Sequence, residues 1–444
     1  MSLCSLFLSR GFAFYDPGCS DLIIPESTVH QHAALTPFAL RLAKHLAAAS
    51  CGANPAFSPL SVYAALALVA AGARGRTLQE ILAALGARSR DELAVLVAAV
   101  VRSAIADQSR SGGPAVANAT GMWHDATCVI RPGFRDAAAA SYKAETRAVD
   151  FRNEPEKAVC QINSWVAAAT NNLIDSILAP ASLEKNTSLV LANAIYFKGK
   201  WDEPFDKADT VVDKFYRLDG IAAAGARFMR SRSSQFISVR DGLKVLKLPY
   251  ESSPPLRPWH QGLGPGGWPN ATAAGQQVSR YSMYVFLPDE RDGLPDLVDR
   301  ITTMPGFWRY RLPETRVPVG EFRLSKFKLS FSGSLTGVLR DGMGIRAALD
   351  AGQADLSDMA VVDEDDGSGM PLFADEVCHK AVIEVNEEGT EAAAATFMLC
   401  GATCPPGPPR RVDFVADHPF TFFVVEEVSE AILFVGHVLD PTKY

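Results

Sequence analysis

The chain has 444 residues, of which 48% are hydrophobic and 21% charged, and its formal net charge at pH 7 is -7. A chain of this length can bury a large core, and no clear linker divides it into separate domains. The negative charge argues against a protein that binds nucleic acid through phosphates, and no apolar run is long enough for a membrane-spanning helix. We therefore expect neither a nucleic-acid partner nor a membrane partner.

Residues 1–30 are predicted to be a flexible N-terminal extension that precedes a single domain over residues 31–444. Arg10 interrupts the apolar stretch near the start, and no basic residue comes before it, which disfavours a cleaved secretory signal. An intracellular, cytoplasmic location is the expectation, with the extracellular space as the alternative. The eight cysteines show no metal-ligand spacing, so free thiols are expected, with no metal site and no cofactor.

The first half of the chain has the apolar spacing of helices. Residues 36–46 place their large apolar side chains on one face, as in an amphipathic helix, and residues 163–178 do the same. Residues 60–71 are apolar all round and predict a buried helix.

Two short patterns predict where further helices begin. Thr77–Glu80 has the capping-box spacing and predicts the start of a helix that Gly86 ends. Ser89–Glu92 has the same spacing and predicts the start of a helix that continues through residues 93–105.

Strands are predicted farther along the chain. Residues 189–197 are almost entirely apolar, which is typical of a central strand buried on both faces. The exception is Asn193, whose amide must find partners there, so this residue either satisfies buried backbone groups or lies where the sheet rearranges.

The strands near the C-terminus complete the predicted fold class. Residues 322–331 alternate in polarity with a one-residue slip at Ser325–Lys326, which predicts a β-bulge. Residues 420–425 and 431–435 predict a buried hairpin. Helices first and strands later indicate an α+β fold with antiparallel sheets.

Two segments are predicted to be surface loops. Residues 251–280 hold five prolines and five glycines, which predicts an insertion on the surface. Its Gly262–Gly267 segment matches a phosphate-binding GxGxxG pattern by chance, because the neighbouring prolines exclude the required strand, turn and helix. The acidic residues 363–366 are interpreted as a solvated loop.

The stretch from Glu384 to Arg411 has no helical stripe and ends in a proline cluster. Residues 390–403 contain one charged residue, Glu391, and no proline. Small side chains at alternate positions from Thr390 to Thr396 would let this segment lie over a packed core as an additional strand, with Gly389 as its pivot. A connection of this length within a compact domain tends to be functional or disordered, and the low charge and lack of proline in residues 390–403 argue against disorder.

This stretch resembles the serpins, and the plant serpins of the serpin-Z type most closely. The resemblance rests on Glu387–Thr396, on the downstream block Asp413–Phe420, on Leu189–Trp201 and on Phe57–Val62. The matches follow in order from residue 36 to residue 441. The resemblance implies an α+β serpin fold, with about eight or nine helices around three mainly antiparallel β-sheets and an exposed reactive-centre loop within residues 387–412.

The resemblance also assigns roles to individual residues. The hinge of the loop would consist of Glu387, Glu388, Gly389, Thr390, Glu391, Ala392, Ala393, Ala394, Ala395 and Thr396. The shutter, a region under the main sheet where strands part, would contain Ser58, Ser61, Asn193 and His379. Trp201 would lie at the breach, where insertion of the loop begins.

The usual spacing from Gly389 places the reactive bond at Thr403–Cys404. Threonine in this position suits a protease pocket for small or β-branched side chains. Residues 397–399 could instead serve chymotrypsin-like or papain-like enzymes, whereas residues 410–411 lie too far along the loop for a trypsin-like one. The segment after Thr403 is about three residues longer than is usual in the family, by the same count from Gly389.

The function implied by the resemblance is inhibition of serine endopeptidases, with papain-like cysteine endopeptidases as a further target class. The protease would cleave the loop and form an acyl-enzyme, and the cut loop would then enter the main sheet between the strand at 189–197 and the strand that ends near 385. We expect a monomer, which is not an enzyme, that forms a covalent 1:1 complex with its target. The alternative is a non-inhibitory serpin with a carrier, storage or chaperone-like role.

Overall fold

The structure is a computed structural model, and it describes residues 35–49, 53–252, 279–304, 306–362, 372–389 and 411–443. The predicted N-terminal extension, residues 253–278 of the insertion and the acidic residues 363–366 lie outside the described residues. Residues 390–410 also lie outside them.

Within the described residues, the strands form three large sheets and one small one. The five-stranded sheet has the order β13-β15-β5-β2-β4, with β2 at Ala115–Asp125, β4 at Glu145–Val149, β5 at Leu189–Lys198, β13 at Phe327–Ser334 and β15 at Glu376–Val385. The seven-stranded sheet has the order β1-β18-β17-β10-β9-β8-β11, with β1 at Ala56–Phe57, β8 at Gln235–Arg240, β9 at Leu243–Pro249, β10 at Tyr281–Pro288, β11 at Arg316–Val317, β17 at Phe420–Glu426 and β18 at Ala431–Val438. The four-stranded sheet has the order β16-β12-β7-β6, with β6 at Val211–Tyr216, β7 at Ala222–Met229, β12 at Val319–Ser325 and β16 at Val412–Ala416. Strands β3 at Cys128–Ile130 and β14 at Ala360–Val362 form the small sheet.

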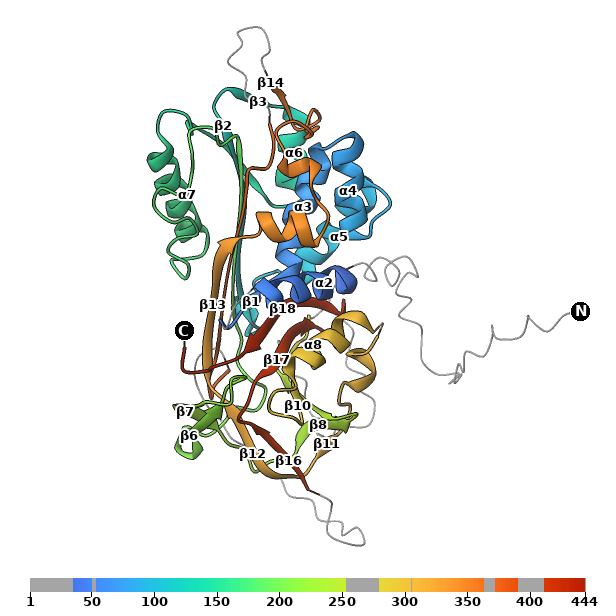
Figure 1. Cartoon of the computed structure of the whole chain (residues 1–444), viewed down its shortest axis with the longest axis vertical. Coiled ribbons are helices and arrows are strands. Elements are labelled where there is room, and N and C mark those ends of the chain that lie inside the picture. The colour runs from blue at the N-terminus through green and yellow to red at the C-terminus, as the bar shows by residue number, and fades with distance from the viewer. Residues whose placement is uncertain are drawn as a thin grey trace, which may run out of the picture.

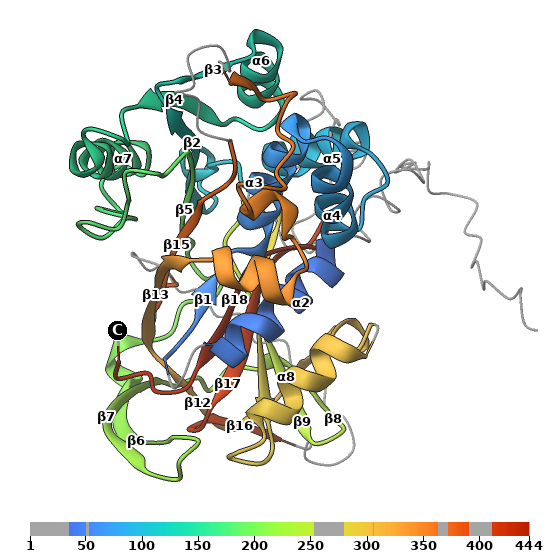
Figure 2. The ribbon, with the colours of Figure 1, turned by 45° about the horizontal axis from the view of Figure 1, so that its top comes forward.

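Helices cover both faces of the five-stranded sheet. The α-helices of the described residues are α2 at Leu35–Ala49, α3 at Pro59–Gly72, α4 at Gly75–Leu85, α5 at Arg90–Ser103, α6 at Pro132–Ser141, α7 at Pro155–Ala169 and α8 at Leu294–Thr303. Short helical turns occur at Ser109–Ser111, Lys207–Asp209, Arg309–Arg311, Val338–Gly342 and Ala347–Leu349. Figure 1 shows α7 on one face of this sheet, with α3 and its neighbouring helices on the opposite face. Figure 2 shows α2 and α8 beside the strands of the seven-stranded sheet.

The core has two parts, one on each face of the five-stranded sheet. The larger part joins α3 and the seven-stranded sheet to one face, and the smaller part packs α7 and the loop after it against the other face. The side chains of β5 alternate between them: Leu189, Leu191 and Ile195 belong to the larger part, and Val190 and Ala192 to the smaller. Because successive side chains of a strand point to opposite faces, β5 is buried on both sides.

Several predicted elements are confirmed. Helix α3 is buried almost throughout, as its apolar sequence predicts, and Gly86 ends α4 in the left-handed conformation. Ser89 caps α5 by accepting a hydrogen bond from the backbone N–H of Glu92. The hairpin of β17 and β18 is antiparallel, and the α+β class is confirmed by the arrangement as a whole.

The predicted capping box at Thr77–Glu80 is wrong. Helix α4 begins at Gly75, so both residues lie inside it, and their side chains bind another part of the chain. Thr77 Oγ1 accepts the backbone N–H of Asp355 at 3.0 Å, and Glu80 Oε2 accepts that of Ala347 at 2.7 Å. The two side chains have the sequence spacing of a capping box, but they bind a neighbouring loop instead of the start of their own helix.

The predicted helix over residues 163–178 exists, but its predicted bounds are wrong. Helix α7 begins earlier, with Pro155 in its first turn, and ends at Ala169. Asn171 and Asn172 then adopt positive φ angles of 52° and 59°, which a helix does not allow. The apolar residues that follow still face the sheet, but they belong to a loop.

The phase slip at Ser325–Lys326 does not mark a bulge inside one strand. Strand β12 ends at Ser325 and pairs with β7 and β16, whereas β13 begins at Phe327 and pairs with β15. The change of phase occurs where the chain passes from the four-stranded sheet to the five-stranded sheet.

Candidate functional site: the hinge and the seam between two parallel strands

The site is built around the contact between β5 and β15, which we call the seam. These two strands are parallel, and their Cα partners run from Glu376 opposite Val190 to Ile383 opposite Phe197. Each has an antiparallel neighbour on its other side, β2 beside β5 and β13 beside β15. The seam is therefore a parallel contact in the middle of the sheet between two antiparallel pairs.

The chain reverses direction immediately after β15. Asn386 and Gly389 form an antiparallel bridge, and Gly389 forms another with Lys200. Gly389 has a φ of +112°, and a Cβ added there would lie 2.3 Å from the carbonyl oxygen of Gly199. Both the backbone conformation and the close approach require glycine at this position. A chain that continued straight from this turn would run antiparallel to β15 and, because β5 is parallel to β15, antiparallel to β5 as well.

Trp201 is buried beside this turn. Its indole Nε1–H donates to the carbonyl oxygen of Asn386 at 2.9 Å. Its backbone N–H donates to the carbonyl oxygen of Glu388 at 3.1 Å. The indole stacks on the ring of Tyr250, with 4.5 Å between ring centroids. The structure thus places the predicted breach residue against the start of the predicted hinge.

The carboxylate of Glu387 is held inside the protein. Its Oε2 accepts from Lys326 Nζ at 2.6 Å, and its Oε1 accepts from Thr210 Oγ1 at 2.6 Å. Burial acts to raise the pKa of Glu387, but the hydrogen bonds from Lys326 and Thr210 outweigh it, and the pKa is lowered. The next residue, Glu388, forms an ion pair with Lys207, which is largely exposed. The first two hinge residues are therefore anchored by cations on neighbouring segments.

The four predicted shutter residues come together near the middle of the seam. Asn193 Oδ1 accepts hydrogen bonds from Ser61 Oγ and from His379 Nδ1, the latter at 2.9 Å. His379 Nε2 lies 3.0 Å from the backbone nitrogen of Ser58 and accepts its N–H. Ser58 caps α3 by accepting from the backbone N–H of Ser61 at 3.3 Å. The N-terminus of α3 is thus bonded to both strands of the seam.

This bonding fixes the protonation state of His379. Because Nε2 accepts a hydrogen bond, the ring proton must be on Nδ1, which donates to Asn193. The ring is buried, and burial lowers the pKa of His379 to about 3. The imidazole is therefore neutral at physiological pH, and adding a proton would remove the acceptor of the Ser58 N–H.

Sequence reasoning missed a fifth member of the shutter cluster. Thr120 in β2 accepts a hydrogen bond from Asn193 Nδ2 at 3.0 Å through its Oγ1. The two residues are 73 positions apart in the chain, and nothing in the local sequence of β2 distinguishes this threonine from others. Lys326 and Thr210, the partners of Glu387, were missed for the same reason.

The remaining predicted site residues cannot be placed. Thr390–Thr396 of the hinge and the predicted bond Thr403–Cys404 lie outside the described residues. In the part of the chain that is described, no group of histidine, cysteine and carboxylate side chains is arranged to hold a metal ion. Among the same residues, no helix is long and apolar enough to span a membrane.

Comparison with known proteins identifies the family. The family model described as "Serpin (serine protease inhibitor)" matches residues 33–441. The chain belongs to the serpin family. Among curated relatives, the rice (Oryza sativa subsp. japonica) protein named "Putative serpin-Z8" is 52% identical to this serpin over 423 residues, which cover 93% of this chain and 97% of the relative. Rice "Serpin-Z2A" is 50% identical over 429 residues, which cover 92% of this chain and 97% of the relative.

The fold of this serpin is also that of solved serpin structures. An Arabidopsis structure, described as "Structure of Arabidopsis AtSerpin1. Native Stressed Conformation", superposes with a TM-score of 0.80 and 35% sequence identity, and the match covers 93% of this chain and 99% of that one. The α+β serpin fold and the similarity to plant serpins, both predicted from the sequence, are confirmed.

Proposed function

We propose that this serpin is an irreversible inhibitor of serine endopeptidases that acts by insertion of its cut loop into the seam. The observation that supports this most directly is the geometry of the seam. Strands β5 and β15 are adjacent and parallel, and the chain reverses at Gly389 into the direction that an antiparallel strand between them would require. An inserted strand would replace one parallel pairing by two antiparallel ones.

The first step is an attack on the loop by the target protease. The serine oxygen of the protease bonds to the carbonyl carbon of the scissile residue, and the bond from that carbon to the next nitrogen breaks. The nitrogen leaves as an amine with a proton supplied by the protease, and the upstream part of the loop stays attached through an ester. This serpin contributes the peptide bond, and the catalytic groups belong to the protease.

The second step is insertion of the freed segment. About a dozen residues would gain ladder hydrogen bonds, each with a net contribution of about 0.5–1.5 kcal/mol, for a total on the order of 10 kcal/mol. This equals the free energy of unfolding of a typical domain, about 5–15 kcal/mol. Such a driving force is sufficient to carry the tethered protease along the sheet and to distort its catalytic site before the ester is hydrolysed.

The predicted reactive bond is Thr403–Cys404, and it favours a target with a pocket for small or β-branched side chains. Papain-like cysteine endopeptidases are a second target class, because residues 397–399 offer them a bulky apolar position. The expected complex contains one serpin monomer and one protease.

The direct test is incubation with a panel of serine and cysteine endopeptidases, followed by denaturing electrophoresis. The proposal predicts a boiling-resistant adduct of the summed mass with at least one elastase-like enzyme. Mass spectrometry of the released C-terminal peptide would identify the bond, with residue 404 as its expected first residue. Cleavage in the loop by every enzyme of the panel, without an adduct, would contradict the proposal.

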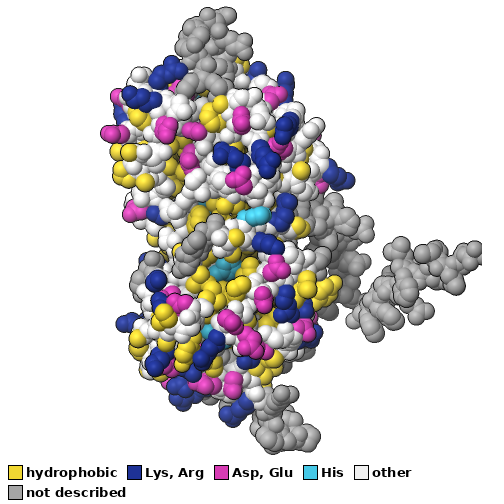
Figure 3. All heavy atoms as spheres, in the orientation of Figure 1, with side chains coloured by type: hydrophobic (Ala, Val, Ile, Leu, Met, Phe, Trp, Pro, Cys, Tyr) yellow, Lys and Arg dark blue, Asp and Glu magenta, His cyan; other side chains and the backbone are white. Residues whose placement is uncertain are grey.

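A carrier role is a second candidate, supported by one cavity. A mostly apolar cavity of about 400 Å³ lies between α2, α8 and β18, and the buried ring of His437 forms part of its wall. Neither ring nitrogen of His437 has a hydrogen-bond partner among the described residues. Figure 3 shows hydrophobic side chains gathered near the middle of the face that it draws. A carrier needs no insertion, so a serpin that gains no thermal stability after a single cut in its loop would favour this role.

A further inference from the structure

The connection between β7 and β8 carries arginines and serines in alternation. Strand β7 ends at Met229 in the four-stranded sheet, and β8 begins at Gln235 in the seven-stranded sheet, so residues 230–234 pass from one sheet to the other. This segment, with the sequence Arg-Ser-Arg-Ser-Ser, is called the sheet-crossing loop below. Its exposed residues are Arg230, Arg232, Ser233 and Ser234.

The spacing of arginines before Ser233 is that of a substrate for a basophilic protein kinase. Among the serines and threonines of the sequence, only Thr77, Ser233 and Thr303 have an arginine three positions earlier. A guanidinium binds carboxylates through a planar set of donors, so a kinase with carboxylates in its peptide groove selects this spacing. The structure decides which of the three hydroxyl groups such a kinase can reach.

Thr77 is out of reach. It has arginines one and three positions earlier, at Arg76 and Arg74, and therefore the same spacing as Ser233. However, Thr77 is buried, and its Oγ1 accepts the backbone N–H of Asp355 at 3.0 Å. A kinase could not bind this hydroxyl group while the protein is folded.

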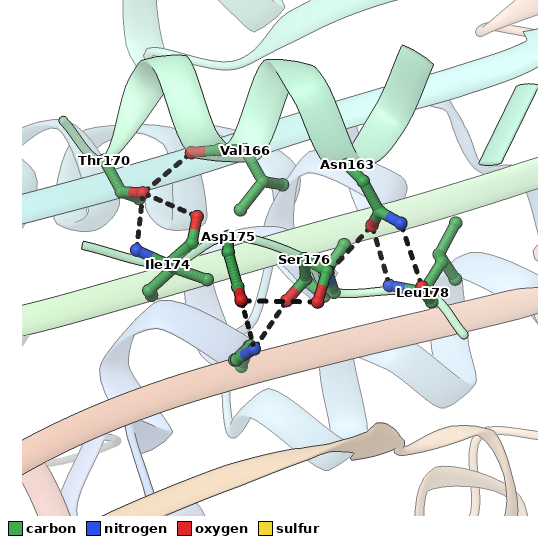
Figure 4. Close-up of polar contacts among 9 residues, drawn as sticks. Asn163, Val166, Thr170, Ile174, Asp175, Ser176 and Leu178 are labelled. Carbon is green, nitrogen blue, oxygen red and sulfur yellow. Dashed lines mark hydrogen bonds and ion pairs between the residues drawn. The ribbon is translucent and has the colours of Figure 1, made fainter. Parts of the chain in front are cut away.

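Thr303 is fixed to its own helix. It is the last residue of α8, and its Oγ1 donates to the carbonyl oxygen of Asp299 at 2.7 Å. Figure 4 shows the same bond at the end of α7, where Thr170 Oγ1 donates to the carbonyl oxygen of Val166. Protein kinases bind their substrates as extended segments, so a hydroxyl group that is bonded to its own helix is a poor substrate.

Ser233 differs from both threonines. It is exposed, and it lies at a bend outside the helices and strands. Ser231 Oγ accepts the backbone N–H of Ser233 at 3.2 Å and also accepts from Gln235 Nε2 at 2.9 Å, so the hydroxyl group of Ser231 is used by the fold. The hydroxyl group of Ser233, by contrast, has no hydrogen-bond partner among the described residues.

The two arginines of the sheet-crossing loop are accessible to a kinase. Arg230 is exposed and has no acidic partner in the part of the chain that the structure describes. Arg232 lies 3.5 Å from Asp209 Oδ1, but its side chain is 87% exposed, so solvent weakens this ion pair. Both guanidinium groups can therefore turn to carboxylates of another protein at little cost.

A phosphate on Ser233 would lie next to a third guanidinium. Arg316 of β11 donates to the carbonyl oxygen of Ser234 at 3.3 Å and pairs with Glu203 at 2.6 Å. Its guanidinium lies 4.7 Å from the centre of the Phe236 ring, which fixes its position. A phosphate has three acceptor oxygens and a charge of about -1.5 to -2, and arginines bind it by charge-assisted hydrogen bonds.

The sheet-crossing loop is also connected to the anchor of the hinge. Asp209, the partner of Arg232, lies in the same helical turn as Lys207, which pairs with Glu388 of the hinge. A phosphate on Ser233 competes with Asp209 for Arg232 and makes the charge of this surface more negative by about two units. Such a change alters the attraction of a charged protein that approaches the hinge.

We propose that Ser233 is a phosphorylation site for a protein kinase that selects arginines one and three positions before the serine, and that Arg232 and Arg316 hold the phosphate. In the transfer, Ser233 Oγ bonds to the γ-phosphorus of a nucleoside triphosphate on the kinase, and the bond from that phosphorus to the oxygen of the nucleoside diphosphate breaks. The hydroxyl proton goes to a carboxylate of the kinase. The site does not depend on the proposed inhibitory function.

The test incubates the whole folded chain with ATP and the catalytic subunit of cyclic-AMP-dependent protein kinase, which has this preference. Mass spectrometry of the intact chain and of its peptides measures how many phosphates are added and where. Ser233→Ala removes the hydroxyl group, and Arg230→Gln removes the first arginine of the pattern. Ser231→Ala and Ser234→Ala are the matched controls.

The expected result is one phosphate on Ser233 and none in Ser233→Ala. Arg230→Gln should lower the rate about tenfold, because a charge-assisted contact is lost, and the two control variants should stay within about threefold of the wild type. Thr77 should accept phosphate in a synthetic peptide of residues 71–80 but not in the folded chain. A folded chain that accepts no phosphate, or accepts it at Ser231 or Ser234 instead, would overturn the proposal.

Phosphorus NMR of the phosphorylated chain tests whether the phosphate is held. The second pKa of a phosphoserine is about 6, and a neighbouring guanidinium lowers it. Arg316→Gln should raise this pKa by about half a unit. Arg240→Gln should leave it unchanged, because Arg240 is exposed at the other end of β8. Equal pKa values in the wild type and in Arg316→Gln would overturn the assignment of Arg316.

Discussion

Asn193 and His379 face each other across the seam, with His379 Nδ1 bonded to Asn193 Oδ1 at 2.9 Å. One residue belongs to β5 and the other to β15, so the strands that would part during insertion are joined by side chains as well as by backbone bonds. The same two residues bind Ser61 and Ser58 at the start of α3. The shutter cluster therefore couples the seam to the helix beneath it.

Replacing Asn193 by alanine should lower the free energy of unfolding of the uncut form by about 1–3 kcal/mol. The substitution leaves the His379 Nδ1–H and the Ser61 hydroxyl buried without partners, and an unsatisfied buried polar group costs this much. Urea unfolding followed by circular dichroism measures the loss. Asn118→Ala in β2 is the control and should cost less, because Asn118 Oδ1 has no partner among the described residues and its Nδ2 makes only a long contact, 3.5 Å to Thr120 Oγ1. Equal stability of the Asn193→Ala variant and the wild type would contradict the assigned bonding.

Acid should destabilise the uncut form between pH 6.5 and pH 4.5. Burial lowers the pKa of His379 to about 3 and that of His437 to about 4, so in this window the unfolded chain binds protons at these positions while the folded chain does not. Each such histidine decreases the free energy of unfolding by about 1.4 kcal/mol per pH unit below about pH 6.5.

Urea unfolding at a series of pH values measures this slope, and His379→Gln should make it smaller without abolishing it, because burial also lowers the pKa of His124 and of His437. The lowered pKa of Glu387 acts below pH 4.5 and therefore outside this window. A free energy of unfolding that stays constant from pH 6.5 to 4.5 would show that these two histidines are not buried in the neutral form.

Glu387→Gln should destabilise the uncut form by about 2–3 kcal/mol. The substitution removes the counter-charge of the Lys326 ammonium. The side chain of Glu387 is only 5% exposed, so solvent cannot replace the lost interaction. Adding Lys326→Met to this variant should restore part of the loss, which a double-mutant cycle measures. Glu388→Gln is the control and should cost less than about 1 kcal/mol, because its partner Lys207 is 68% exposed.

Much of the fold could be predicted from the sequence because its signals are local. The apolar run of β5, the apolar residues of α3 and the serine cap of α5 each reflect the environment of one element. The errors arose where a local pattern had a distant cause. Thr77 and Glu80 have the spacing of a cap but bind a loop near residue 350, and the stripe over 163–178 continues through a loop that faces the same core.

The candidate site was predicted through resemblance more than through chemistry. Asn193 alone signalled a buried polar group that needed partners, and the family pattern added Ser58, Ser61 and His379. Thr120 and Lys326 could not be found in this way, because ordinary threonines and lysines become distinctive only when the fold brings them to Asn193 and Glu387.

Replacing Thr390 by arginine should convert the inhibitor into a substrate. An arginine at an inward position of the inserted strand would place a charge in the sheet, so insertion would stop at the first residue and the ester would be hydrolysed. Denaturing electrophoresis should then show cleaved serpin and no adduct. Glu391→Arg is the control, because this position of an inserted strand would face water and already carries a charge. This variant should still form the adduct. A Thr390→Arg protein that traps its target would contradict insertion.

The most direct measurement is the melting temperature of the protein before and after a single cut within residues 390–403. If the uncut chain holds β5 and β15 together in a state of higher free energy than the form with the loop inserted between them, the cut form should melt at a clearly higher temperature, by about 10 °C for a gain on the order of 10 kcal/mol. A cut form that melts at the same temperature as the intact protein, or at a lower one, would contradict the account.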